Sequence, residues 1–362
     1  MKAAICYEFG QPLVVEEVKL DPPQAGEVRV RVAACAICHS DVHQIRGEWG
    51  GSVPVISGHE AAGIVAECGP GVTRVQPGDH VVLSLLRQCG CCFQCTIGRP
   101  YNCEFPYALD TEHRLHTLGG APIHQGIRCA TFAEEAVVDQ SQVVKIPDEL
   151  PLDVACLLAC GVITGLGAVT NTVQVETGST VVVIGTGGVG LNAVQGALLS
   201  GASLIAAVDL LPNKLAAARS FGATHTINAG EENVVERVLA LTDGRGADYA
   251  FATVGSPRAI EQAVQMVRKG GTAVIVGMPG NDEVMISLNA HHLTQGRTVR
   301  GSNMGSTRLL VDIPRLVALY QEGRLKLDEL VTGRYPLAEI NEAIASMERG
   351  EALRNVVVMG GE

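Results

Sequence analysis

The chain has 362 residues, of which 47% are hydrophobic and 18% are charged, and its formal net charge is −11. This length favours about two domains, each large enough for its own core. The chain has no basic run that could neutralise phosphates, which argues against a nucleic-acid partner. No stretch reaches about 18 uninterrupted apolar residues, and the first ten residues are not typical of a signal peptide. We therefore expect a cytoplasmic protein without a membrane partner.

The first 160 or so residues are predicted to be mostly β structure. Polar and apolar side chains alternate over residues 27–32, and glycine and proline interrupt the chain at 69–71 and 77–78. From residue 180 the pattern changes: an apolar run at 181–184 is followed by a glycine turn, a helical stretch and a second apolar run at 204–208. Repeated units of this kind predict an α/β fold in which a doubly wound parallel sheet, a Rossmann domain, follows the β region.

The last part of the chain carries a helical pattern around residues 313–321 and a strand pattern at 355–359. We expect this segment to return to the first domain. Residues 1–161 and 304–362 are therefore assigned to one domain, and residues 162–303 to the Rossmann domain.

A glycine-rich turn with the sequence Gly-Thr-Gly-Gly-Val-Gly predicts a dinucleotide site. Gly185, Gly187, Gly188 and Gly190 follow a strand and begin a helix, and Asp209 ends the next strand 19 residues after Gly190. The glycines let the backbone approach a pyrophosphate, the helix amides bind it, and the carboxylate accepts from ribose hydroxyls. No arginine directly follows Asp209, whose charge would repel a 2′-phosphate, so NAD is predicted in preference to NADP. The alternative is that Asp209 is a solvated acid at a strand end.

The 12 cysteines of this chain favour metal or redox chemistry over disulfides. Cys89, Cys92, Cys95 and Cys103 form a C-x2-C-x2-C-x7-C array. Four thiolates at such short spacing are typical of a closed tetrahedral zinc site that stabilises a loop. Cys91 is a fifth thiol within the array, and by register we treat it as a bystander.

A second group, Cys38, His59 and Cys160, is scattered along the chain. A lone cysteine is usually a small buried hydrophobe, and a lone histidine is usually a satisfied polar group. Together they could supply two thiolates and one imidazole. The fourth position of a zinc ion would then stay open for water or a substrate oxygen, which is the pattern of a catalytic site.

With these motifs, the chain resembles the zinc-containing medium-chain alcohol dehydrogenases over essentially its whole length. It is most similar to the long-chain branch with class III-like enzymes and thiol-dependent formaldehyde dehydrogenases, on the motifs at 98–103, 221–226 and 241–244. The resemblance implies a GroES-like, mostly β catalytic domain, one catalytic and one structural zinc per subunit, NAD, and a homo-oligomer, either a dimer or a tetramer. The stretch between Cys103 and Cys160 is shorter than in the long eukaryotic class III enzymes.

The resemblance also assigns roles to single residues. Cys38, His59 and Cys160 become the catalytic zinc ligands, and the four-cysteine array becomes the structural site. Asp41 would orient His59, and Glu60 would lie near the metal. Ser40 would bond the alcohol and pass its proton towards His43. The positions matched to the cofactor are His39, Thr164, Val189, Lys214 and Arg354, and those matched to the substrate pocket are Trp49 and Leu85.

The implied reaction is reversible hydride transfer between a primary alcohol, or its aldehyde, and NAD(H). Zinc would acidify the bound alcohol, and Trp49 and Leu85 predict an apolar pocket that suits an uncharged substrate. Two alternatives within the family are a formaldehyde dehydrogenase acting on a thiol adduct and a variant with tightly bound nicotinamide. A polyol dehydrogenase is disfavoured because that branch generally replaces Cys160 with an acid. Outside the enzymes, the alternative is a silent NAD-binding scaffold.

Overall fold

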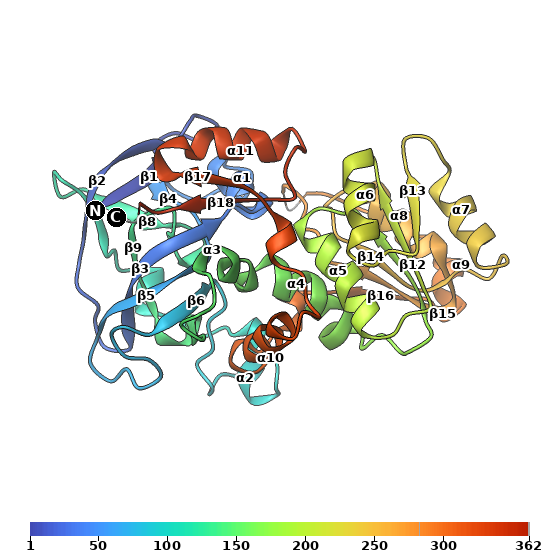
Figure 1. The fold of residues 1–362 in the computed structure, drawn as a ribbon, viewed down its shortest axis with the longest axis horizontal. Helices are drawn as coiled ribbons and strands as arrows, with labels where there is room; N and C mark the ends of the chain where they lie inside the picture. Colours follow the sequence, from blue (N-terminus) through green and yellow to red (C-terminus); the bar gives the residue numbers. More distant parts are fainter. Residues whose placement is uncertain (282, 361–362) are drawn as a thin grey trace. The chain divides into compact units, whose positions relative to one another are not determined.

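The computed structural model describes residues 1–281 and 283–360 (Figure 1). The chain divides into two compact units. Unit 1 consists of Met1–Cys160 and Arg308–Glu362, and unit 2 is the uninterrupted segment Gly161–Thr307. The segment from Arg308 therefore belongs to the first unit.

Unit 1 is built mainly from β-strands, in a small closed barrel and a larger sheet. The barrel strands, in spatial order, are β1 (Lys2–Cys6), β2 (Val14–Leu20), β7 (Leu115–Thr117), β8 (Pro122–Gln125) and β4 (Val55–Ile56). The sheet strands, in spatial order, are β10 (Val143–Lys145), β6 (His80–Ser84), β5 (Glu60–Cys68), β3 (Glu27–Ala36), β18 (Arg354–Val358) and β17 (Val331–Pro336), and β9 (Glu135–Asp139) also pairs with β3. The predicted strand at 27–32 is confirmed within β3, where Val28 and Val30 are buried and Arg31 is exposed.

Short helices connect and cover these strands. The α-helices of unit 1 are α1 (His39–Ile45), α2 (Phe93–Thr96), α3 (Leu152–Ala155), α10 (Leu309–Gln321) and α11 (Ile340–Glu348). Its 3-10 turns are η1 (Pro100–Asn102), η2 (Ala108–Asp110), η3 (Gly126–Arg128), η4 (Gln140–Gln142), η5 (Cys156–Ala159), η8 (Asp328–Leu330) and η9 (Leu337–Glu339). The segments that carry the metal-binding candidates are therefore short helices and turns held on a β framework.

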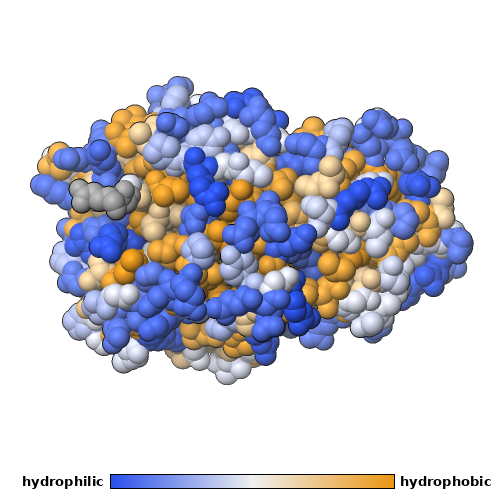
Figure 2. Space-filling view, viewed as in Figure 1, coloured by the Kyte–Doolittle hydropathy of each residue, from blue (hydrophilic) through white to orange (hydrophobic). Residues whose placement is uncertain are grey.

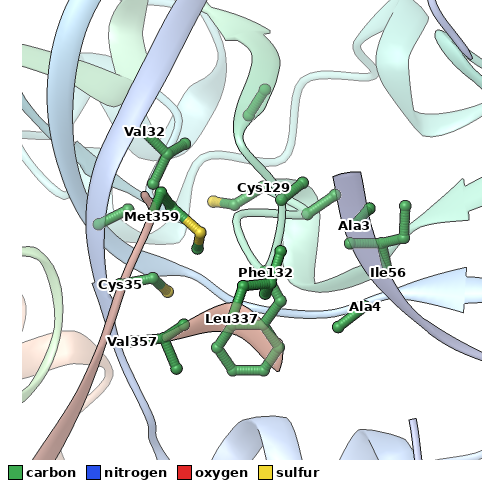
Figure 3. Close-up of a cluster of buried hydrophobic side chains, with 14 of the residues drawn as sticks. Ala3, Ala4, Val32, Cys35, Ile56, Cys129, Phe132, Leu337, Val357 and Met359 are labelled. Atoms are coloured by element: carbon green, nitrogen blue, oxygen red, sulfur yellow. The ribbon is translucent and has the colours of Figure 1, made fainter. Parts of the chain in front are cut away.

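The core of unit 1 surrounds the fully buried ring of Phe132, and Figure 3 shows this cluster with Leu337, Val357 and Met359. Gly58 lies directly against the backbone of this core. It has a φ of +93°, and a Cβ there would lie 2.5 Å from the Phe132 nitrogen. Only glycine fits this close approach. The close packing fixes the path of the backbone into His59, which is a metal-ligand candidate.

Unit 2 is a six-stranded, fully parallel sheet with helices between its strands, so the predicted doubly wound Rossmann fold is confirmed. The strands, in spatial order, are β13 (His225–Asn228), β12 (Leu204–Asp209), β11 (Thr180–Ile184), β14 (Ala247–Ala252), β15 (Val267–Ile275) and β16 (Thr298–Gly301). The helices are α4 (Gly161–Gly167), α5 (Gly188–Leu199), α6 (Pro212–Ser220), α7 (Val234–Leu241), α8 (Pro257–Met266) and α9 (Ala290–Thr294), with the turns η6 (Ala168–Thr172) and η7 (Met304–Ser306). β11 is buried along its whole length, as a central strand covered on both faces must be.

On the face drawn in Figure 2, hydrophilic and hydrophobic residues are interspersed. Within the described part of the chain, no single helix is long and apolar enough to cross a membrane. One bent pair of helical segments, Leu152–Ala159 with Gly161–Thr172, passes that test only when the two are taken together, by length and composition.

Candidate metal centres and cofactor site

Three segments of unit 1 bring Cys38, His59 and Cys160 together. Cys38 is the N-cap of α1, His59 directly precedes β5, and Cys160 directly follows η5. The two sulfur atoms and a ring nitrogen of His59 all lie within 4.8 Å of one another. We call these three residues the open group, because three donors leave one position of a tetrahedral metal free.

The buried carboxylate of Asp41 holds this arrangement. Its Oδ2 accepts from the Cys38 backbone nitrogen at 3.0 Å, and its Oδ1 accepts from the Gly58 nitrogen at 2.9 Å and from His59 Nδ1 at 2.8 Å. Because Nδ1 carries the donated proton, Nε2 of His59 presents its lone pair to the two thiols. Nε2 is buried and has no hydrogen-bond partner of normal geometry among the described residues. A buried ring nitrogen with a free lone pair, whose partner nitrogen is hydrogen-bonded to a carboxylate, is typical of a histidine that binds a metal.

Burial and mutual contacts shift the pKa values of all three residues of the open group. A hydrogen bond from Cys160 and the nearby His59 outweigh burial and hold the pKa of the Cys38 thiol well below its ordinary value. The same contact with Cys38, together with burial, raises the pKa of Cys160 well above its ordinary value. Burial lowers the pKa of His59, but the charge and hydrogen bond of Asp41 outweigh it and leave that pKa raised. Two thiols beside an imidazole are a donor set suited to Zn²⁺.

Glu60 and Arg354 form a buried ion pair next to the open group. Nη2 of Arg354, at the start of β18, donates to Oε2 of Glu60, and both side chains are almost completely buried. Burial lowers the pKa of Arg354, but the negative charges of Glu60, Cys38 and Cys160 outweigh it and raise that pKa. In this structure, therefore, Arg354 compensates charge around the open group.

The second metal-binding candidate, the four-cysteine group, consists of Cys89, Cys92, Cys95 and Cys103. All four sulfur atoms lie within 4.8 Å of one another, with Cys92–Cys103 at 3.8 Å and Cys89–Cys95 at 4.0 Å. Sulfur atoms bound tetrahedrally to zinc at about 2.3 Å lie roughly 3.8 Å apart, so the spacing fits the metal.

Backbone amides stabilise thiolates in this loop. The nitrogens of Cys91 and Cys92 donate to Cys89 Sγ at 3.4 and 3.2 Å. Against desolvation, these bonds lower the pKa of Cys89 to about 6. The side chain of Cys91 is exposed and lies outside the four-cysteine group. Its contribution in this structure is the amide that it donates to Cys89.

The residues expected to move a proton lie on α1. Ser40 Oγ is 3.8 Å from Cys38 Sγ, so the hydroxyl is adjacent to the open group. Nδ1 of His43 donates to the carboxylate of Glu48, and the His43 ring lies against Trp49, with centroids 5.2 Å apart. Glu48 was not identified from the sequence, although an acid five residues after a relay histidine and next to a pocket residue is a usable signal.

The two residues expected to line the substrate pocket have different surroundings. Trp49 lies beside His43, as described above. Leu85 is half-buried and packs against the core of unit 1. His39 is the exposed first residue of α1.

In unit 2, the glycine turn joins β11 to α5, as predicted. Gly185 has a φ of +88°, and a Cβ on Gly190 would lie 1.8 Å from the Gly185 oxygen, so both positions require glycine. Asp209 is at the end of the neighbouring strand β12. Its Oδ2 accepts from the Thr186 nitrogen at 2.7 Å and from the Thr186 hydroxyl at 2.9 Å, and its Oδ1 accepts from the Leu210 nitrogen at 2.8 Å.

These bonds hold the carboxylate beside the glycine turn, where a ribose would be recognised. Thr186 was missed in the sequence, although a hydroxyl residue inside the glycine motif is a visible signal. Val189 lies in the first turn of α5, and Lys214 is buried in α6. Thr164, in α4, contacts Met304 Sδ through its hydroxyl at 3.6 Å.

Two protein-family models match parts of this chain. Residues 24–148 match the family model described as alcohol dehydrogenase GroES-like domain, and residues 188–322 match the model described as zinc-binding dehydrogenase. The first range contains Cys38, His59 and the four-cysteine group, and the second contains Asp209.

Two relatives and one solved structure that match the chain over nearly its whole length are also alcohol or S-(hydroxymethyl)glutathione dehydrogenases by name. The chain is 40% identical to an NDMA-dependent alcohol dehydrogenase of Amycolatopsis methanolica, over 99% of this chain and 98% of that protein. It is 39% identical to an S-(hydroxymethyl)glutathione dehydrogenase of Paracoccus denitrificans, over 99% of each. The crystal structure of benzyl alcohol dehydrogenase from Acinetobacter calcoaceticus superimposes with a TM-score of 0.93 at 33% identity, covering 99% of both chains.

Proposed function

We propose that this chain, which belongs to the zinc-containing medium-chain alcohol dehydrogenase family, interconverts a primary alcohol and its aldehyde by reversible hydride transfer with NAD(H). It is a zinc-dependent oxidoreductase with a GroES-like unit and a Rossmann unit that uses a nicotinamide dinucleotide. The observation that carries the proposal is the open group, in which Asp41 turns the lone pair of His59 towards Cys38 and Cys160.

Each residue of the open group has a distinct task in this proposal. A zinc ion held by Cys38, His59 and Cys160 would supply a Lewis acid that makes a bound alcohol more acidic. Asp41 keeps the proton of His59 on Nδ1, so that Nε2 stays available as a ligand. The buried guanidinium of Arg354 offsets the negative charge that two thiolates and Glu60 bring together.

The proton of the alcohol needs a route away from the site. We assign the first position to the Ser40 hydroxyl, which is adjacent to Cys38, and the last to His43. Because Nδ1 of His43 donates to Glu48, its Nε2 is the nitrogen able to take up a proton. Glu48 would stabilise the imidazolium that forms, as carboxylates do for histidine bases in other enzymes.

For the cofactor we propose NAD, bound by a domain that spans residues 162–303. Gly187, Gly188 and the start of α5 would bind the pyrophosphate through backbone amides. Asp209 would accept from the adenosine ribose and repel a 2′-phosphate. The Thr186 bonds support this assignment, because they hold the carboxylate in one orientation.

For the substrate we propose an uncharged primary alcohol of medium aliphatic or aromatic size. Trp49 and Leu85 would give an apolar pocket, which gains roughly 0.8 kcal/mol for each buried methylene, whereas an unpaired carboxylate is costly to desolvate. A thiol adduct of formaldehyde is the second candidate, because the Paracoccus denitrificans relative carries that activity in its name. A third variant, left open by the family resemblance, keeps its nicotinamide bound between turnovers.

A substrate panel tests these proposals. Purified protein should contain about two zinc ions per chain, reduce NAD faster than NADP, and show kcat/KM rising from ethanol to hexanol and to benzyl alcohol. Formaldehyde should be assayed with and without glutathione or another small thiol. A steep rise in turnover only on addition of the thiol would replace the alcohol proposal by the adduct. Turnover that needs an added electron acceptor but no added NAD would indicate the tightly bound nicotinamide.

We also propose a homo-oligomer in the cytoplasm. β16 is an edge strand of the unit 2 sheet, and Met278 and Met285 of the same unit are 58% and 81% exposed. An open strand edge is suited to pairing with a second copy of itself, and exposed apolar side chains are common at interfaces between copies. The twelve cysteines are thiols and not disulfides, which suits a reducing compartment. Light scattering coupled to size exclusion measures the mass, and a monomer at micromolar concentration would contradict the oligomer.

A further inference from the structure

Ser84 connects two of the segments that carry the open group. It is the last residue of β6 and is fully buried, and in the sheet it pairs in register with Glu60, the residue after His59. Its hydroxyl donates to the carbonyl oxygen of Ala159, the residue before Cys160, at 2.7 Å. The Ser84 side chain therefore ties the backbone next to Cys160 to β6. Because β6 pairs with β5, which begins directly after His59, Ser84 connects the two ligand segments.

The hydrogen-bond network continues from Ser84 to Gln142 and Arg87. Its carbonyl oxygen accepts from Nε2 of Gln142 at 2.9 Å, and Oε1 of Gln142 accepts from Nε of Arg87 at 2.8 Å. Gln142 is completely buried, and Arg87 is 2% exposed. Because buried polar groups are costly to leave unpaired, each member of this chain holds the next in a defined place.

Arg87 also contacts the segment that follows the four-cysteine group. Its guanidinium carbon lies 5.0 Å from the centre of the Tyr107 ring, and Nη1 donates to Oδ1 of Asp110 at 2.5 Å. The hydroxyl of Tyr107 is 3.9 Å from Cys103 Sγ. A continuous path of contacts thus runs from Cys103 to the carbonyl next to Cys160.

We propose that Ser84 is a positioning residue for Cys160, and that the buried path through Gln142 and Arg87 couples metal retention at the open group to the four-cysteine group. The inference rests on the proposed function, in which both groups hold zinc. If the Ala159 carbonyl loses its donor, the Cys160 thiolate is no longer pre-placed for the metal. Polar partners that orient metal ligands contribute about 10- to 100-fold to metal affinity.

The test compares Ser84→Ala with Ser179→Ala. Ser179 is a buried serine of unit 2 whose hydroxyl donates to the Glu176 carbonyl at 2.6 Å, so it controls for the loss of a buried hydroxyl. Zinc-loaded, full-length protein is exposed to 1,10-phenanthroline and pulsed with iodoacetamide. Mass spectrometry then gives the rate at which Cys38 and Cys160 become alkylated. We expect this rate to rise about tenfold in Ser84→Ala and to stay at the wild-type value in Ser179→Ala.

The coupling is tested with Gln142→Leu, alone and combined with Ser84→Ala. Gln142→Leu should speed alkylation at Cys160 and also at Cys103, because it breaks the path between the two groups. The double variant should be no faster at Cys160 than the faster of the two single variants, since both changes interrupt the same path. If Gln142→Leu does not fold, Tyr107→Phe replaces it, because that change removes only the hydroxyl beside Cys103.

The outcomes separate this inference from the proposed function. Protected thiols in the wild type, together with an unchanged rate in Ser84→Ala, would overturn the positioning role alone. Rates that multiply in the double variant would overturn the coupling. If Cys38 and Cys160 were alkylated at once in the wild type even with added zinc, the proposed metal site would fail, and this inference would fail with it.

Discussion

His43 and Glu48 are bonded to each other where α1 ends, with Nδ1 of the imidazole donating to the carboxylate. Glu48→Ala is expected to lower kcat for alcohol oxidation about tenfold, a part of the roughly 10²-fold or more that a positioned base contributes. KM should change little, because neither residue is proposed to contact the alcohol. Glu48→Gln keeps an acceptor oxygen and should lose less. Steady-state kinetics checks this prediction, and a wild-type kcat in Glu48→Ala would remove Glu48 from the proton route.

The two metal groups should respond differently to the loss of a ligand. Cys160→Ala is expected to retain about one zinc ion per chain and a near-wild-type Tm but to lose at least 99% of turnover, because an open site performs the chemistry. Cys92→Ala should also lose about one zinc ion, but its Tm should fall by roughly 5 °C or more, since a closed site contributes folding free energy. Metal analysis measures the zinc content of each variant, and calorimetry measures its Tm. Full stability in Cys92→Ala with losses in Cys91→Ala would show that Cys91 is the ligand.

Asp209 and Thr186 should determine cofactor choice. Asp209→Gly is expected to weaken NADH binding about tenfold or more and to raise the relative activity with NADP, because it removes both an acceptor and a repulsive charge. Thr186→Val removes one of the bonds that orient the carboxylate and should weaken NADH binding less, without a gain for NADP. Fluorescence titration of NADH and kinetics with both cofactors give the comparison. A wild-type enzyme that prefers NADP would contradict the role given to Asp209.

The buried pair Glu60–Arg354 should show strong non-additivity. Arg354→Met leaves the Glu60 carboxylate buried without its cation, and breaking one side of such a pair costs about 3–5 kcal/mol of unfolding free energy. Adding Glu60→Gln removes that uncompensated charge and should restore part of the loss. Urea unfolding followed by circular dichroism measures Arg354→Met, Glu60→Gln and the double variant. Equal losses in the single and double variants would mean that the pair does not act as a unit.

The parts of the fold with a regular pattern could be predicted from the sequence. The alternation at 27–32 and the apolar runs at 181–184 and 204–208 are all present as strands in the structure. The helix predicted around 313–321 begins earlier, at Leu309, and accommodates Pro314. The order of strands in the sheets could not be predicted from the sequence, because hydrogen-bonded neighbours such as β3 and β18 are separated by most of the chain.

For the candidate site, spacing and residue type identified the donors but not the residues that hold them. The cysteine array and the glycine turn are local motifs, and their chemistry follows from their spacing. Ser84, Gln142 and Arg87 are ordinary polar residues in sequence, and only the folded chain shows that they are buried and bonded to one another. Their contribution depends on long-range contacts, which no local pattern encodes.

The place of β18 in the sheet sets the order in which the chain can mature during synthesis. Strand β3 cannot gain this neighbour, and Glu60 cannot gain Arg354, until all of unit 2 has been translated. Unit 2 is one uninterrupted segment, so it can form its sheet first, whereas the strands of unit 1 wait with an unpaired edge. Nascent chains arrested after residue 307 should therefore resist protease in unit 2 before they do so in unit 1. Unit 1 of this enzyme is then most exposed to aggregation and to chaperones while its last strand is still on the ribosome.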